Sequence, residues 1–140
     1  MRHITPQMAA NVLNALPSPF DAHAAEKEAL RQYPLEVGRQ IGCYTNSPTM
    51  TALQKFSMQF ARYIDRLFGS KAATPQIRKT AGTGGTGKVV GEHLGGRDAK
   101  NQEWEKINPG TPTTPPLGHT DLADLFPDLN LNADPADDLP

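Results

Sequence analysis

The stretch from Ser47 to Gly69 constrains the fold most, because its beginning, its buried face and its end can all be recognised in the sequence. Ser47 suits the N-cap of a helix, Pro48 suits the first helical position, and Gly69 suits the left-handed residue that closes a helix. The stretch therefore predicts one long helix over residues 47–68. Apolar residues recur along it at helical spacing and predict a single buried stripe: Leu53, Phe56, Phe60, Ile64 and Leu67.

A second stripe on the same predicted helix is polar and mostly basic. It also recurs at helical spacing and consists of Lys55, Gln59, Arg62 and Arg66. One face of an amphipathic helix packs on a core and the other stays polar. The sequence therefore predicts that this second stripe meets water or an anion.

Charge is distributed unevenly along the 140 residues, although the formal net charge is only -1. Residues 1–54 carry four Lys/Arg and four Asp/Glu. Residues 55–106 carry ten Lys/Arg against five acids, a net of +5, whereas residues 107–140 carry six Asp and no Lys or Arg. A basic middle followed by an acidic end suggests a nucleic-acid-binding surface and a tail that competes for it. The alternative is a solvated face with a solubilising tail.

Cysteine and histidine usage favours neither disulfides nor a metal site. Cys43 is the only cysteine, so no intrachain disulfide can form, which fits a reducing cytoplasm. No apolar run approaches the ~20 residues that span a bilayer, and we expect a soluble cytoplasmic protein. The histidines are scattered and share no ligand spacing with Cys43, so no metal site is expected. They are His3, His23, His93 and His119.

Three shorter helices are predicted before the long one, and a β-hairpin after it. Thr5 and Pro6 open the first helix, Asp21 caps the second, and the third ends at Gly42. Residues 77–80 and 88–94 suit two short strands, with the glycine-rich residues 82–87 as a flexible hairpin tip. Trp104, the only large apolar side chain in residues 95–106, is expected to pack against the body. The predicted fold class is mainly α with a small β-hairpin.

This order of elements resembles the winged helix-turn-helix superfamily. The resemblance is carried by Val-Gly-Arg-Gln-Ile-Gly at residues 37–42, the turn at 43–46, the helix at 47–68, and the strands Ile-Arg-Lys-Thr and Lys-Val-Val. It spans about residues 5–94. In that superfamily the second helix of the motif enters the major groove, and the wing contacts the neighbouring backbone or minor groove. The resemblance implies a protein that contacts duplex DNA through helix 47–68 and a basic hairpin.

The resemblance also implies which residues contact DNA. Four residues in the leading turns of the long helix, with one behind them, would reach base edges: Thr49, Thr51, Gln54, Lys55 and Arg62. Basic residues that bracket the wing would contact phosphates without reading sequence, and one more would extend the footprint: Lys71, Arg78, Lys79, Lys88 and Arg97.

No enzyme site is expected. Residues 82–88 match the spacing G-x-x-x-x-G-K of a phosphate-binding loop, but Val89 stands where that loop needs a magnesium-binding hydroxyl. We therefore expect no cofactor. The leading hypothesis is a DNA-binding regulatory or accessory protein, with a role in transcription regulation as one form of it. The alternative is a non-enzymatic interaction module, an inhibitor or assembly adaptor, in which the side of Phe56 and Phe60 contacts a protein. A homo-oligomer is compatible with either.

The last quarter of the chain is expected to lie outside the folded domain. We expect a domain over residues 1–106, a stiff Pro/Thr-rich linker over 107–120, and a disordered acidic tail over 121–140. The tail has three interpretations: it shields the basic face, it recruits a partner, or it only solubilises. Recruitment would use the apolar residues Leu122, Leu125 and Phe126.

Overall fold

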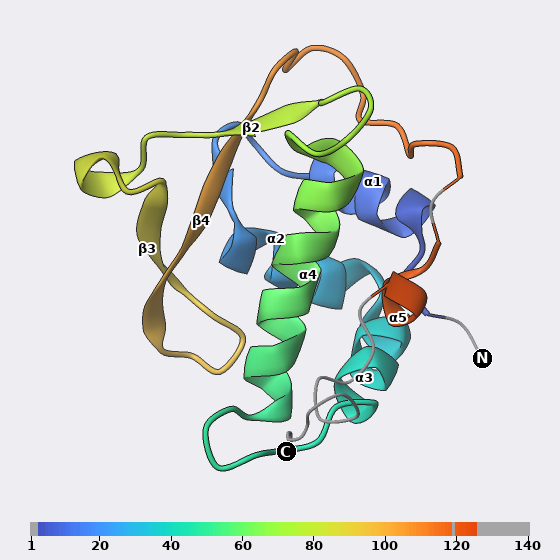
Figure 1. The fold of residues 1–140 in the computed structure, drawn as a ribbon, viewed down its shortest axis with the longest axis vertical. Coiled ribbons are helices and arrows are strands. Elements are labelled where there is room, and N and C mark those ends of the chain that lie inside the picture. The colour runs from blue at the N-terminus through green and yellow to red at the C-terminus, as the bar shows by residue number, and fades with distance from the viewer. Residues whose placement is uncertain (1–2, 119, 126–140) are drawn as a thin grey trace.

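The computed structural model describes residues 3–118 and 120–125, and within them it shows five α-helices and a small antiparallel sheet (Figure 1). The helices are α1 (Pro6–Asn14), α2 (Ala22–Gln32), α3 (Pro34–Gly42), α4 (Ala52–Phe68) and α5 (Leu122–Leu125). The strands are β1 (Phe20–Asp21), β2 (Ile77–Lys79), β3 (Lys88–Glu92) and β4 (Asp98–Lys106), with a 3-10 turn, η1 (Thr83–Gly85), between β2 and β3. In the described ranges, none of the helices combines the length and apolar character that a bilayer crossing requires.

α1 and α2 begin, and α3 ends, where the sequence predicts. The Thr5 side chain accepts from Met8 N at 3.1 Å, and the Asp21 side chain accepts from Ala24 N at 2.8 Å. α3 ends at Gly42 as predicted. These boundaries are confirmed because each depends on a hydrogen bond or a backbone preference within a few residues.

The long helix begins later than predicted. Thr51, not Ser47, is the N-cap, because Thr51 and Gln54 form a capping box in which each side chain accepts from the backbone N–H of the other. The Ser47 hydroxyl instead accepts from Met50 N within the preceding loop, so Pro48 is not the first helical residue. Gly69 has a φ of −88°, which is not the left-handed conformation that we predicted.

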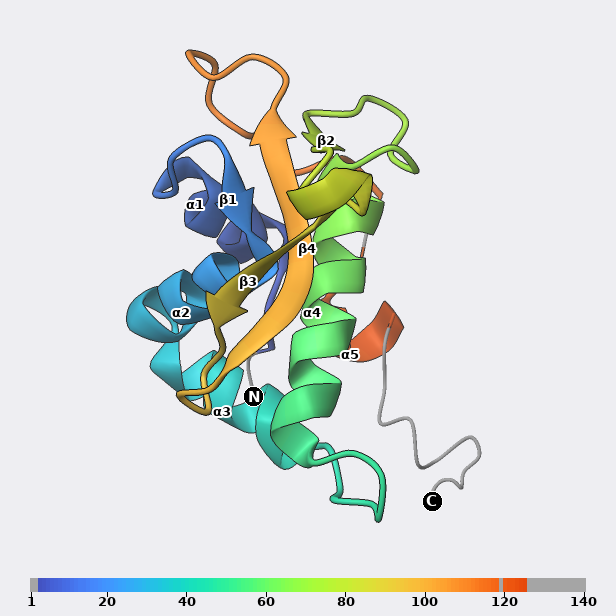
Figure 2. The ribbon, with the colours of Figure 1, turned by 90° about the vertical axis from the view of Figure 1, so that its left-hand side faces the viewer.

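The apolar stripe of α4 is confirmed except at Leu53, which is half-buried, and part of the basic stripe is wrong. Phe56, Phe60, Ile64 and Leu67 are fully buried in the core, as predicted. Lys55 and Gln59 are buried as well, with Lys55 only 2% exposed and its Nζ donating to Thr45 O. The buried surface of α4 is therefore wider than one stripe, because helices and the sheet pack on it from several sides (Figure 2).

The central strand is β4, which sequence analysis missed. β1 pairs with one edge of β4, with Phe20 opposite Trp104. β2 and β3 share the other edge, because Thr80 N donates to Glu103 O while Glu103 N donates to Gly87 O. In Figure 2, α4 and α5 lie on one side of β4 and α1 and α2 on the other. Trp104 is buried against this body, as predicted.

The predicted hairpin of residues 77–80 with 88–94 is therefore wrong. The true hairpin is β3–β4, with its turn at residues 93–97, where His93 N donates to Arg97 O at 3.1 Å. The glycine run is a loop inserted between β2 and β3, closed where Gly87 N donates to Ala81 O at 2.7 Å. Gly82 and Gly87 have φ values of 63° and 77°, which only glycine adopts readily. Figure 1 shows this loop projecting from the edge of the sheet.

The segment of residues 107–118 is bonded to the body at Thr113 and Thr114, so this part of the predicted linker is not a free spacer. Asn14 exchanges two hydrogen bonds with the backbone of Thr113, at 2.9 and 2.7 Å. Gln76 does the same with the backbone of Thr114, at 2.8 and 2.9 Å. Two amide side chains thus take the place of neighbouring strands and hold this segment against α1 and β2.

The beginning of the predicted tail is also folded. Leu122 is 0% exposed, and its backbone N donates to Ile4 O at 2.9 Å. Its proposed role in docking a partner is therefore wrong, because a side chain inside this core cannot reach another protein. The Leu125 side chain, Phe126 and the rest of the predicted acidic tail lie outside the described residues.

Candidate functional site

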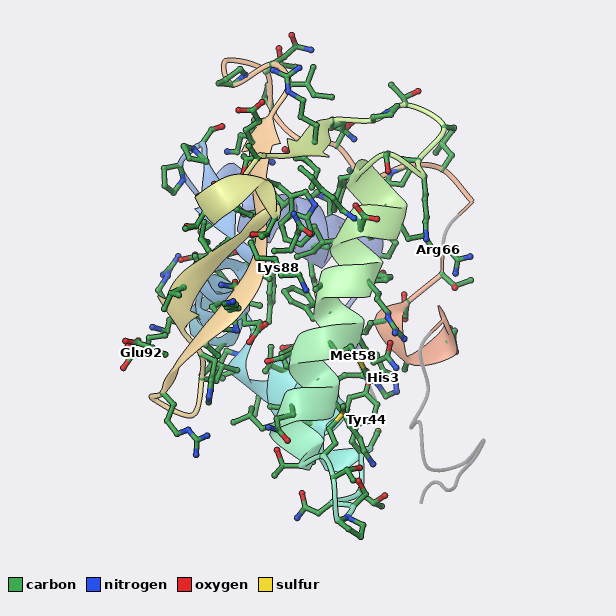
Figure 3. The ribbon with its side chains drawn as sticks, turned by 60° about the vertical axis from the view of Figure 1, so that its left-hand side comes forward. His3, Tyr44, Met58, Arg66, Lys88 and Glu92 are labelled. Carbon is green, nitrogen blue, oxygen red and sulfur yellow. The ribbon has the colours of Figure 1, made fainter. Side chains whose placement is uncertain are left out.

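A groove of about 610 Å³ lies between α4 and the β3–β4 hairpin, and the first turns of α2 form its floor. α4 contributes its face with Ser57, Met58 and Arg62, and the hairpin contributes both strands and the turn between them. Figure 3 shows Lys88 between the hairpin and α4, whereas Glu92 points away from the groove. Helix and hairpin are separate in sequence, so only the tertiary structure creates this site.

The rim of the groove is basic. Four Lys/Arg line it against two acids, Glu26 and Asp98. The basic residues are all exposed, and they come from α4, from both hairpin strands and from the turn: Arg62, Lys88, Arg97 and Lys100. Low-dielectric walls focus the field of such charges, so the groove attracts anions more strongly than the net charge of the chain suggests.

The groove contains five of the ten residues that sequence analysis predicted for DNA binding. These five are Thr51, Gln54, Arg62, Lys88 and Arg97. The side-chain oxygens of Thr51 and Gln54 already accept backbone hydrogen bonds in the capping box of α4. Of these five, only the three basic residues bring charge to the groove, and the Arg62 Nη1 also donates to Gln59 Oε1 at 3.5 Å.

The other predicted contact residues lie elsewhere. Thr49, Lys71, Arg78 and Lys79 do not line the groove, and the Arg78 Nε donates to Glu105 Oε2 at 2.5 Å. Lys55 is buried under Thr45 and cannot reach a ligand at the surface. Its assignment as a base-reading residue is wrong, because α4 turns that side chain towards the core rather than to solvent.

The floor of the groove carries a buried carboxyl that sequence analysis missed. Glu26 is 1% exposed, and its Oε1 accepts from the Ser57 hydroxyl at 2.7 Å. Its Oε2 has no hydrogen-bond partner among the residues that the structure describes. Burial raises the pKa of Glu26 to about 7, against the lowering effect of the Ser57 hydrogen bond, and the Asp21 charge adds to the rise.

The sequence contained a signal for this burial. Because its sequence neighbours are charged, Glu26 is predicted to lie on the solvent-exposed face of the second helix. That prediction is wrong. Ala22, Glu26 and Ala29 recur at helical spacing, so Glu26 lies on the same face as two small apolar residues. All three are buried. Small residues let α4 pack closely beside the Glu26 carboxyl.

A polar network attaches the hairpin to the start of α2. The Asn101 Oδ1 accepts from His23 N at 2.7 Å, and the Asn101 Nδ2 donates to Val89 O at 3.0 Å and to Asp21 Oδ2 at 3.3 Å. His23 Nδ1 lies 2.8 Å from Gly91 O, and its ring meets that of His93 edge to face at 5.7 Å. One buried asparagine of β4 thus fixes the hairpin against the start of α2, because it bonds to β3 and α2 at once.

Gly91 is the closest approach in this attachment, and Gly91→Ala is expected to destabilise the protein by about 1–3 kcal/mol. A Cβ at this position would lie 2.3 Å from Asp21 Oδ2, so either the hairpin or the α2 cap must shift. Gly38→Ala is the matched control, since a Cβ there meets nothing within 4 Å and alanine favours the helix. Urea denaturation checks both, and equal stability of Gly91→Ala and the wild type would contradict the role of this contact.

Other candidate chemistry finds no support in the described residues. The glycine loop is followed by strand β3 and not by a helix whose N-terminus would bind phosphate, so the match to a phosphate-binding loop does not hold. Cys43 is exposed, and within residues 3–118 and 120–125 no three His, Cys, Asp or Glu side chains gather as a metal site would require.

Known proteins give no further guide to this site. Comparisons of the chain with protein-family models, with curated protein sequences and with solved structures gave no match. What the groove does must therefore be inferred from its own geometry and charge.

Proposed function

We propose that this protein binds DNA through the groove between α4 and the β3–β4 hairpin, as a non-enzymatic regulatory or accessory protein. One observation supports this most: four exposed basic side chains, one from α4 and three from the β3–β4 hairpin, line one groove. They are Arg62, Lys88, Arg97 and Lys100. Phosphate contacts from Lys and Arg dominate the affinity of most DNA-binding proteins, and they need no fixed base sequence.

The winged helix-turn-helix arrangement forms part of this proposal. α3 and α4 would supply its two helices, and the β3–β4 hairpin follows them where a wing would stand. The groove differs from a simple wing, because its basic residues face α4 across the cavity rather than pointing away from the body. A phosphate backbone would accordingly run between helix and hairpin.

The surface on which the alternative, a protein-interaction module, depends is not available for contact with a partner. It relied on the side of α4 that carries Phe56 and Phe60, and both side chains are fully buried and stacked on each other at 5.4 Å between ring centroids. The acidic end of the chain keeps its place in the proposal: carboxylates there would compete with phosphate for the basic rim and so lower affinity for DNA.

Replacement of Lys88 and Lys100 by alanine is expected to weaken binding to random duplex DNA and to flatten its salt dependence. Each lost phosphate contact lowers the slope of log K against log salt by about 1, so the double variant should lose about 2. The measurement is fluorescence anisotropy at about 50 mM and about 200 mM salt.

Arg39→Ala is the matched control, because Arg39 is exposed on α3 and does not line the groove. It should leave both affinity and slope unchanged. Wild-type protein that binds neither duplex nor single-stranded DNA at low salt, or an Arg39→Ala loss equal to that of the double variant, would rule out binding by this groove.

A further inference from the structure

The floor of the groove differs chemically from its rim, and the difference says more about the ligand than the basic charge does. The rim carries exposed cations, whereas the floor carries the buried Glu26–Ser57 pair. The groove is also lined by half-buried apolar side chains, Leu53 and Met58 of α4. A ligand that fills the groove therefore meets cations, apolar surface and a carboxyl.

The Glu26 carboxylate can accept one more hydrogen bond, which the described residues do not supply. Its Oε2 is buried and has no partner among them, although Oε1 is bonded to Ser57. Buried polar atoms in native proteins nearly always have partners, so an unpaired carboxyl oxygen beside a cavity marks a binding position.

The rim limits what that partner can be. A cationic donor, such as an amine or guanidinium, would be repelled by the lysines and arginines through which it must pass. The floor therefore suits a neutral N–H donor, and the rim suits an anion joined to it. A nucleotide combines the two, because its phosphate is anionic and its base carries neutral N–H groups.

Size excludes a paired base. A groove of about 610 Å³ falls in the range of small-molecule pockets and cannot enclose a duplex. The unpaired oxygen of Glu26 is also buried below the rim, where only a base released from its stack could reach it.

We propose that the groove holds one unpaired nucleotide of a DNA strand, with its phosphate against Lys88 and Lys100 and the amino group of its base donating to Glu26. This inference rests on the proposed DNA binding and specifies its substrate class. Leu53 and Met58 would cover the face of the base. A carboxyl acceptor selects a base with an amino group: cytosine presents an N4 amine where uracil presents an oxygen, and two facing oxygens would repel.

Short single strands of deoxycytidine and of deoxyuridine test this, because the two probes differ at the position that Glu26 would read. With the full-length protein at about pH 8, where Glu26 is mostly ionised, fluorescence anisotropy should show about tenfold tighter binding of the deoxycytidine strand. The protein should also bind this strand more tightly than a duplex of matched length.

The double variant Glu26→Met with Ser57→Ala removes both members of the buried pair with little change in shape, and thermal unfolding confirms that it folds. It should lose the preference for deoxycytidine and bind deoxyuridine at least as tightly as the wild type does, because the repulsion between the two facing oxygens is removed. Lys88→Ala should weaken binding of both strands equally.

Three outcomes would overturn the inference, and they differ from failure of the proposed function. Equal wild-type affinity for the two strands would remove the reading role of Glu26 but leave DNA binding intact. A preference that persists in the double variant would assign it to other residues. Tighter binding of duplex than of either strand would exclude an unpaired nucleotide. Absence of binding to every probe would overturn the proposed function as well.

Discussion

Glu26→Gln is expected to stabilise the protein by about 3 kcal/mol at about pH 8 and to have no effect below about pH 4.5. The buried Glu26 has a pKa of about 7 in the folded protein, against 4.5 in the unfolded chain. As pH rises between these values, the unfolded chain releases the proton first, and wild-type stability falls. Below both values the carboxyl is protonated in either state, so glutamine mimics it.

Urea denaturation of both proteins across this pH range checks the prediction, because the difference between the two curves isolates Glu26. Glu92→Gln is the matched control: Lys27 lies 2.9 Å from Glu92 and holds its pKa below the usual value. The control should therefore be no more stable than the wild type at about pH 8. A difference between Glu26→Gln and the wild type that does not vary with pH would contradict the buried, uncompensated carboxyl.

This prediction also bears on function. A charged group that lowers the stability of its own fold is typical of functional sites, where stability is lost in favour of binding or chemistry. Glu26→Gln should gain stability, and the Glu26 and Ser57 double variant should lose its base preference. Both results together would assign the loss of stability and the base preference to the Glu26 side chain.

Leu122→Ala is expected to destabilise the protein by about 2–5 kcal/mol, the range for leucine truncation in a packed core. Leu122 is fully buried although it belongs to a helix of four residues near the end of the described chain. Two hydrogen bonds hold that helix: Leu122 N donates to Ile4 O, and the Tyr63 hydroxyl donates to Thr120 O, both at 2.9 Å. Truncation to alanine would leave a cavity in this packed region, because its close-packed neighbours relax only partially.

Leu117→Ala is the matched control, since Leu117 lies on the same segment but is 98% exposed. Its effect should stay within about 0.5 kcal/mol. Thermal or urea unfolding compares the two, and equal stabilities would show that the C-terminal segment is not part of the cooperative unit. If the prediction holds, experiments on the acidic end must keep residues up to 125.

The sequence by itself determined the elements whose causes are local. The caps Thr5 and Asp21 positioned α1 and α2, and the apolar stripe identified the core face of α4, because these signals act within one or two helical turns. The chemistry of the basic rim is likewise visible in the sequence, since Arg62, Lys88 and Arg97 are among the anion-binding residues that it predicts, and all three line the groove.

Only the tertiary structure decided which segments meet. β2 and β3 suit pairing with each other, yet both pair with β4, because strand pairing depends on distant partners and not on the pattern of either strand. Helical periodicity predicts on which face of a helix Lys55 and Glu26 lie, but not which elements pack on that face. In the folded protein both side chains are buried. The groove depends on the meeting of α4 with a hairpin that Asn101 and His23 join to α2, contacts that no local signal predicts.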